Sequence, residues 1–139
     1  MKNSFHKGEI ASLKVELRAA ELGYYVSKPT VPVRYDIILE KNGKLWRCQI
    51  KYCDYHDKKR SKSSLKLKLG GSKRHTSYSK DEIDILLVYI PKIEDIFWIP
   101  VDRIHKKNDI SLAFKESTRK IGIEREKLRI KSSEFSWKK

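Results

Sequence analysis

The chain has few of the residues that reinforce or anchor a small protein. Its 139 residues include 2 cysteines, 6 glycines and 4 prolines, and they contain neither an internal repeat nor a low-complexity segment. No apolar run approaches the ~18 residues of a membrane-spanning helix, and the N-terminus lacks the apolar stretch of a signal peptide. These absences predict a soluble, cytoplasmic protein that folds without a disulfide framework.

The two cysteines, Cys48 and Cys53, fall in one predicted strand. Because side chains alternate between the two faces of a strand, these thiols point in opposite directions and cannot easily form a bridge. Together with His56 they have the spacing Cys-x4-Cys-x2-His, but no fourth zinc ligand lies nearby in the sequence. The pattern therefore favours a reducing compartment over a zinc site.

Acidic residues are scarce compared with basic ones. The 32 lysines and arginines against 18 aspartates and glutamates give a formal charge of +14 and an isoelectric point near 9.8. Self-repulsion of this kind opposes a compact fold unless a polyanion relieves it, and a nucleic acid backbone is the commonest polyanion. Nucleic acid is the expected partner, with a merely solvated basic surface or an acidic membrane as alternatives.

The apolar content of 39% allows the chain to bury a core of its own, so a single domain over residues 1–139 is expected. Residues 8–22 form a predicted amphipathic helix that ends at Gly23, and its apolar side carries Ile10, Leu13, Leu17 and Ala20. Strands are predicted at residues 24–28, at 34–53 as a hairpin around Asn42-Gly43, and at 83–90, 95–101 and 111–114. This order predicts an α/β fold with a mixed sheet flanked by helices.

Basic residues concentrate in two segments. Residues 54–80 contain nine Lys or Arg against two Asp, and residues 115–139 contain nine against four Glu. In the first segment, leucines at positions 65, 67 and 69 alternate with lysines ahead of Gly70-Gly71, which predicts a basic β-ribbon. A flexible basic loop is the alternative. The second segment is a predicted basic tail.

The hairpin separates polar from apolar side chains. A two-residue turn at Asn42-Gly43 pairs Lys41 with Lys44, and counting outward from that pair places Asp36 opposite Gln49. Lys51 then lies on the same face, opposite Arg34. The other face is a predicted core face that carries Tyr35, Ile37 and Leu39 against Ile50, Cys48 and Trp46. The polar face is either ordinary solvated surface or a site.

An acid, an amide and an amine on one face can assemble a site for phosphodiester hydrolysis. The Asp36 carboxylate, the Ile50 carbonyl and the Gln49 amide oxygen offer Mg²⁺ the hard oxygen ligands that it prefers. Lys51 beside them can activate a water or stabilise the charge that develops at phosphorus. Glu9, at the border of the apolar side of the helix, is a further candidate, and Glu16 is its reserve.

With these residues the sequence resembles the PD-(D/E)xK nuclease superfamily. Asp36 matches the strand Asp of that superfamily, and Gln49-Ile50-Lys51 matches its final motif with Gln in place of the acid. The resemblance covers residues 8–104. It is greatest to a branch with Arg-Tyr-Asp and Gln-x-Lys that includes a homing endonuclease encoded in a cyanobacterial group I intron. It implies a restriction-endonuclease-like core.

The resemblance also implies the roles of the site residues. Asp36, Gln49, the Ile50 carbonyl and Glu9 would bind Mg²⁺ or another divalent cation, and Lys51 would be the catalytic lysine. Ser12 stands where several relatives carry a helix Glu. The implied activity is Mg²⁺-dependent cleavage of double-stranded DNA at a long specific site by a homo-oligomer, a dimer or a tetramer. A junction-resolving or restriction-type nuclease and a non-cleaving nucleic-acid-binding module are the alternatives.

Basic residues expected to contact DNA lie on the hairpin and in the basic ribbon, where they can reach phosphates or base edges. They are Arg34, Arg47, Lys58, Lys59, Arg60, Lys62, Lys66, Lys68, Lys73, Arg74 and His75.

Overall fold

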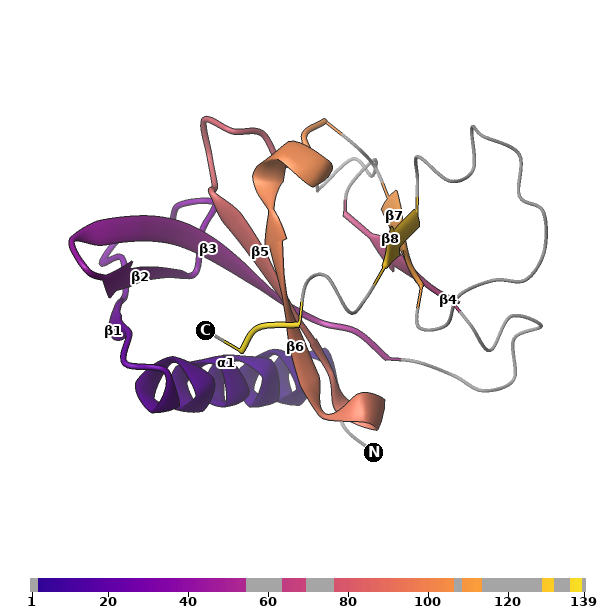
Figure 1. The fold of residues 1–139 in the computed structure, drawn as a ribbon, viewed down its shortest axis with the longest axis horizontal. Helices are drawn as coiled ribbons and strands as arrows, with labels where there is room; N and C mark the ends of the chain where they lie inside the picture. The colour runs from indigo at the N-terminus through magenta and orange to yellow at the C-terminus, as the bar shows by residue number, and fades with distance from the viewer. Residues whose placement is uncertain are drawn as a thin grey trace.

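The computed structural model describes residues 3–54, 64–69, 77–106, 109–113, 129–131 and 136–138. Its larger sheet has five strands in the order β1-β2-β3-β5-β6. These strands are β1 (Tyr25–Ser27), β2 (Ile37–Lys41), β3 (Lys44–Tyr52), β5 (Ile85–Ile90) and β6 (Asp95–Pro100). Neighbouring strands are antiparallel except β3 and β5, which run parallel, so the predicted mixed α/β sheet is confirmed (Figure 1).

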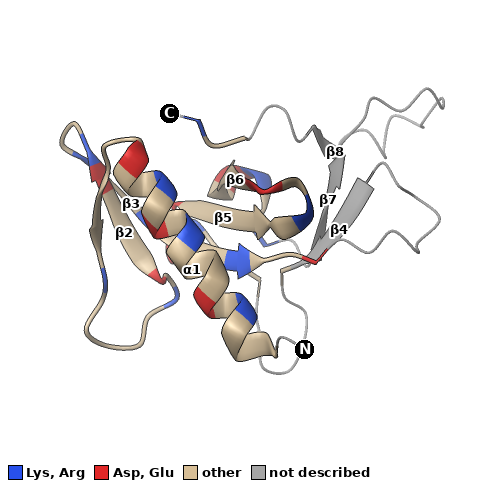
Figure 2. Cartoon of the chain, turned by 90° about the horizontal axis from the view of Figure 1, so that it is seen from below, with Lys and Arg blue, Asp and Glu red and all other residues tan. Residues whose placement is uncertain are grey.

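The helix α1 (Ser4–Glu21) covers one face of this sheet, with acidic and basic residues along its exposed side (Figure 2). It begins four residues earlier than predicted because Asn3 caps it: the Asn3 side chain accepts the backbone N–H of His6 at 3.0 Å. Gly23, with φ of +82°, follows its C-terminal end.

The buried face of α1 differs from the predicted one. Ala11, Val15 and Ala19 are buried against the sheet, whereas Leu13 and Leu17 remain 55% and 58% exposed. The prediction that the two leucines face the core is wrong. Two alanines on the buried face allow the helix to lie close to the strands, and this fit depends on the surface that the helix meets.

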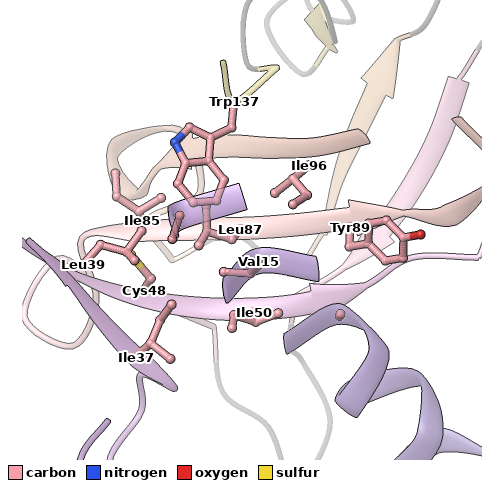
Figure 3. Close-up of a cluster of buried hydrophobic side chains, with 12 residues drawn as sticks. Val15, Ile37, Leu39, Cys48, Ile50, Ile85, Leu87, Tyr89, Ile96 and Trp137 are labelled. Atoms are coloured by element: carbon pink, nitrogen blue, oxygen red, sulfur yellow. The ribbon is translucent and has the colours of Figure 1, made fainter. Parts of the chain in front are cut away.

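β5 is buried along its length because it contributes to two hydrophobic clusters, one on each face of the sheet. Ile85, Leu87 and Tyr89 belong to the helix-side cluster, which also contains Ala11, Val15, Ala19, Ile37, Leu39, Cys48, Ile50, Ile96 and Trp137 (Figure 3). Leu86, Val88 and Ile90 belong to the far-side cluster, which also contains Cys53, Leu69, Tyr78, Ile83, Phe97, Ile99, Val101 and Ile104. A strand covered on both faces is apolar throughout, which explains the continuous apolar run from residue 85 to residue 90.

The hairpin of β2 and β3 has the turn that its Asn-Gly pair predicts. Asn42 and Gly43 have φ of +53° and +75°, the positive values that a type I′ turn requires at both central residues. Lys41 pairs with Lys44, and the pairing continues without a slip as far as Ile37 opposite Cys48. The predicted register is confirmed over these residues.

The regular pairing ends at Asp36. Its backbone N–H donates to the carbonyl of Cys48 at 2.8 Å, although Cys48 is already the partner of Ile37. Asp36 and Ile37 thus both meet Cys48, as in a β-bulge. The predicted pairing of Asp36 with Gln49, and of Arg34 with Lys51, is therefore wrong. The prediction that Tyr35 shares the core face of Ile37 and Leu39 is wrong, because Tyr35 packs against the far-side cluster.

The core extends beyond the predicted range of residues 8–104. Trp137 is buried in the helix-side cluster (Figure 3). Its backbone N–H donates to the Ile96 carbonyl at 2.9 Å, and its backbone carbonyl accepts a hydrogen bond from Arg18 Nη1 at 2.6 Å. Ser136 forms an isolated antiparallel β-bridge with Phe97 of β6. The segment predicted as a basic tail therefore contains a residue that belongs to the core.

A smaller sheet lies to one side of the larger one (Figure 1) and has the strand order β4-β7-β8. Its strands are β4 (Ser64–Lys68), β7 (Asp109–Ala113) and β8 (Arg129–Lys131). β4 is the first strand of the predicted basic ribbon, but it pairs with β7 from a distant part of the chain. The predicted hairpin turn at Gly70-Gly71 and the strand that would follow it lie outside the described residues.

Short 3-10 helices precede and follow β6, namely η1 (Pro91–Ile93) and η2 (Val101–Arg103). In the part of the chain that the structure describes, no helix combines the length and the apolarity needed to cross a bilayer.

Candidate active site

The centre of the candidate site is the contact between the bulge at Asp36 and strand β3. The backbone N–H of Ile50 donates to Asp36 Oδ2 at 2.9 Å. In an extended strand the N–H and C=O of one residue point to the same side, so the Ile50 carbonyl also faces the edge where Asp36 lies. The fold thus brings together the carboxylate and the carbonyl that were predicted as ligands.

Three neighbouring features act on the charge of Asp36. Desolvation raises the pKa of its carboxyl, whereas the hydrogen bond from the Ile50 N–H and the positive charge of Lys51 lower it. Although the carboxylate is crowded on one side, the residue remains exposed, so solvent screens the charge and limits the rise in pKa. A cation bound at this place would favour the ionised form further.

Gln49 and Lys51 alternate along β3 with Cys48 and Ile50, which belong to the helix-side cluster. Their side chains therefore lie on the face opposite α1, the face of the far-side cluster. Lys51 Nζ lies 5.7 Å from the centroid of the Tyr78 ring, a contact that the sequence analysis missed. No local pattern indicates it, because Lys51 and Tyr78 are far apart in the chain and meet only through the packing of the far-side cluster.

Two acids of α1, Glu16 and Glu9, lie close enough to Lys28, which directly follows β1, to act on its charge. Glu16 Oε1 is 2.7 Å from Lys28 Nζ, and this contact, with the charges of Glu16 and Glu9, raises the pKa of Lys28. Since Ser27 pairs with Ile38, Lys28 lies beside the start of β2, near Asp36. Glu16 is thus engaged by a lysine, whereas Glu9 is exposed and remains the candidate from the helix.

The donor chemistry fits a hard divalent cation. Carboxylate, carbonyl and amide oxygens suit Mg²⁺, which commonly takes one or two protein carboxylates and completes its coordination with water and substrate phosphate. Among the described residues no three or more His, Cys, Asp or Glu side chains form a metal-binding group.

The two cysteines lie in different clusters, Cys48 on the helix side and Cys53 on the far side, as their spacing predicts. Burial raises the pKa of both thiols, that of Cys53 to about 11. Both thiols therefore stay protonated near neutral pH, which makes them poor metal ligands. His56 lies outside the described residues.

Arg47, predicted to contact DNA, is engaged within the protein. Its Nε and Nη2 donate to the two carboxylate oxygens of Asp84 at 3.1 and 3.0 Å, and Nη1 and Nη2 donate to the carbonyls of Asp81 and Lys80. These bonds use four of the five guanidinium N–H groups. They weigh against Arg47 as a DNA contact and indicate that it anchors the turn before β5.

Arg34, also predicted to contact DNA, lies beside the candidate site. Its Cζ is 4.5 Å from the Tyr78 ring centroid, and its Nε is 3.4 Å from Glu82 Oε2. Lys66 and Lys68 belong to β4, of which the backbone is described. The other predicted DNA contacts lie outside the described residues; they are Lys58, Lys59, Arg60, Lys62, Lys73, Arg74 and His75.

A mixed sheet with a helix on one face, an acid at a strand bulge and a lysine two residues beyond a glutamine defines a class of nuclease. The family model of the PD-(D/E)XK endonuclease matches residues 2–135, nearly the whole chain. The protein belongs to this family, and the predicted superfamily and restriction-endonuclease-like fold are confirmed.

One solved structure, described as the structure of a bacterial homing endonuclease, I-Ssp6803I, is similar to this chain. The TM-score is 0.70 at 20% sequence identity, and the likeness covers 98% of this chain and 88% of the other. At this identity the likeness shows the fold. A comparison with curated proteins found no match.

Proposed function

We propose that this PD-(D/E)XK endonuclease is a Mg²⁺-dependent enzyme of the homing type that cuts both strands of duplex DNA at a long specific site. The observation that carries the proposal is the hydrogen bond from the Ile50 N–H to Asp36 Oδ2. It sets the Asp36 carboxylate against the backbone of Ile50, and the nearby charge of Lys51 lowers the pKa of that carboxyl.

In this proposal Asp36, the Ile50 carbonyl, Gln49 and Glu9 hold the cation. When bound, Mg²⁺ neutralises phosphoryl oxygens and makes a water more acidic. Lys51 supplies a positive charge next to the phosphorus that is attacked, where it stabilises the negative charge of the transition state and orients the water. Other divalent cations with a preference for oxygen ligands can take the same place.

The charge of the chain supports DNA as the substrate. A formal charge of +14 favours association with a polyanion and predicts affinity that falls steeply with salt. One small subunit with one site must act with a second copy to cut two strands, so we propose a homo-oligomer, a dimer or a tetramer, with two-fold symmetry. Two buried, protonated thiols fit a cytoplasmic protein.

A non-cleaving DNA-binding module is the second candidate, because two positions depart from the acidic pattern. Ser12 stands where relatives carry a helix Glu, and Gln49 stands in place of an acid. Both departures reduce the negative charge available to a cation. If they abolish metal binding, the same surface would hold DNA without cutting it.

The deciding experiment incubates the protein with a library of random-sequence duplexes and Mg²⁺, and maps the ends that form. Cleavage at one long sequence supports the homing type; cleavage at many short sites or of four-way junctions supports the restriction or junction-resolving type. Asp36→Ala and Lys51→Ala are expected to abolish cleavage and to keep DNA binding within roughly tenfold, because most phosphate contacts lie elsewhere.

Lys44→Ala provides the matched control, since Lys44 is an exposed lysine of the same strand at the turn end of the hairpin. It is expected to cut at the parental rate. Cleavage at the parental rate by Asp36→Ala or Lys51→Ala would show that the site is assigned wrongly. Intact duplex with tight binding by the parental protein would favour the binding module.

A further inference from the structure

Tyr78 lies where the far-side cluster meets the proposed catalytic lysine. Only 5% of its surface is exposed, and it packs in the cluster that contains Ile83 and Leu86. Its backbone carbonyl accepts the N–H of Lys106 at 2.9 Å, which ties the segment before β5 to the chain after η2. The Tyr78 ring therefore has a defined position in a packed core.

Two cations lie against this ring. Lys51 Nζ is 5.7 Å and Arg34 Cζ is 4.5 Å from its centroid. Both distances fall within the ~6 Å over which an aromatic face attracts a cation. The ring thus attracts both positive charges, and this attraction offsets part of the repulsion between them.

The second of these cations has an additional partner. Glu82 Oε2 lies 3.4 Å from Arg34 Nε, and the other carboxylate oxygen of Glu82 accepts the hydroxyl of Ser79 at 3.2 Å. Glu82 therefore balances the charge of Arg34 and is itself oriented by the turn that precedes β5. The Tyr78 ring is the contact that Arg34 and Lys51 share.

We infer that Tyr78 is a positioning residue of the active site, whose ring aligns the Lys51 ammonium with the phosphate site and keeps Arg34 beside it as a second phosphate-binding cation. The inference rests on the proposed function, since it presumes a phosphate there. Lysine has a long flexible stem, so a packed ring at its tip restricts where its charge can go. Arg34 can then bind two phosphate oxygens at once.

The test varies the electron density of the ring at position 78 and preserves its shape. Tyr78 is replaced by phenylalanine and by phenylalanines with increasingly fluorinated rings, because fluorine weakens and finally reverses the attraction of the ring face for a cation. The single-turnover cleavage rate is expected to fall stepwise by about tenfold across the series, while the Kd for DNA changes by less than about threefold. If Tyr78 acted only through core packing, the cleavage rate would not change in step with the electron density of the ring.

The same series at Phe97 is the control, because Phe97 is an aromatic residue of the same cluster on β6. It is expected to leave the rate unchanged. A rate that is equal for every ring at position 78, or an equal fall in the Phe97 series, would overturn the inference.

A second measurement does not need cleavage. Ring currents displace the NMR signals of nearby protons, so Tyr78→Leu should move the signal of the Lys51 ε-methylene, which is identified by its absence in Lys51→Arg. A signal that stays in place overturns the inference even in an active enzyme. A signal that moves in a protein that cuts no DNA supports the contact and refutes the proposed function alone.

Discussion

Replacement of Trp137 by alanine tests whether the C-terminal segment belongs to the core. Trp137 is 2% exposed, and its ring centroid lies 5.5 Å from that of Tyr24 and 5.6 Å from that of Trp98. The N–H of residue 137 bonds to Ile96 and its carbonyl accepts Arg18, and both are backbone groups that alanine retains. The substitution therefore measures the side chain.

The expected loss follows from the buried area. About 200 Å² of aromatic surface at ~25 cal/mol per Å² corresponds to about 5 kcal/mol, which a compact unfolded state reduces to about 3–4.5 kcal/mol. This agrees with the ~3–5 kcal/mol typical of Trp→Ala in a core. For a chain of this length the midpoint of thermal unfolding should fall by roughly 10–20 °C.

Far-UV circular dichroism during urea and thermal unfolding provides the measurement, since it does not depend on the tryptophan that is removed. Lys138→Ala, at the exposed neighbouring position, is the control and should change the free energy of unfolding by less than ~0.5 kcal/mol. A loss below ~1 kcal/mol in Trp137→Ala would refute the reasoning, because the helix-side cluster would then be complete without the C-terminal segment.

Three further predictions concern charge and burial. Asp36→Asn should abolish cleavage yet leave the protein as stable as the parent, or slightly more stable, at pH 7. Folding raises the pKa of Asp36, so the ionised carboxylate opposes folding above that pKa, and thermal unfolding measures the change in stability. Asp84→Asn should act in the opposite direction, because Arg47 lowers the pKa of Asp84 in the folded protein. The ionised Asp84 therefore stabilises the fold above its unfolded pKa of ~3.9, and this stabilisation is lost as the pH falls through the lower pKa of the folded state. The variant should be less stable than the parent at pH 7 and should lose less stability in acid. Val15→Glu should unfold the protein, whereas Leu17→Glu should cost under ~1 kcal/mol; equal losses would mean that the buried face of α1 is assigned wrongly.

The strand part of the candidate site could be predicted because it depends on local chemistry. An Asn-Gly pair adopts the positive φ values of a tight turn, and a two-residue turn determines which residues face each other. The positions of Ile50 and Lys51 on β3 could therefore be predicted from the sequence. The bulge that brings Asp36 to the Ile50 N–H, and not opposite Gln49, could not be predicted from the turn. The helix contribution could not be predicted in the same way, because the engagement of Glu16 by Lys28 depends on where β1 lies next to β2.

What the sequence by itself determined is the turn, the hairpin register from Ile37 to Lys41, the buried strands and the basic charge, since each follows from neighbours along the chain. Only the tertiary structure decided that Ala11, Val15 and Ala19 are the buried face of α1, that β4 pairs with β7, and that Trp137 joins the core. It also decided that Tyr78 meets Lys51. These contacts join residues far apart in the chain, and which of several apolar faces is buried depends on shape complementarity between whole elements, a property that periodicity does not contain.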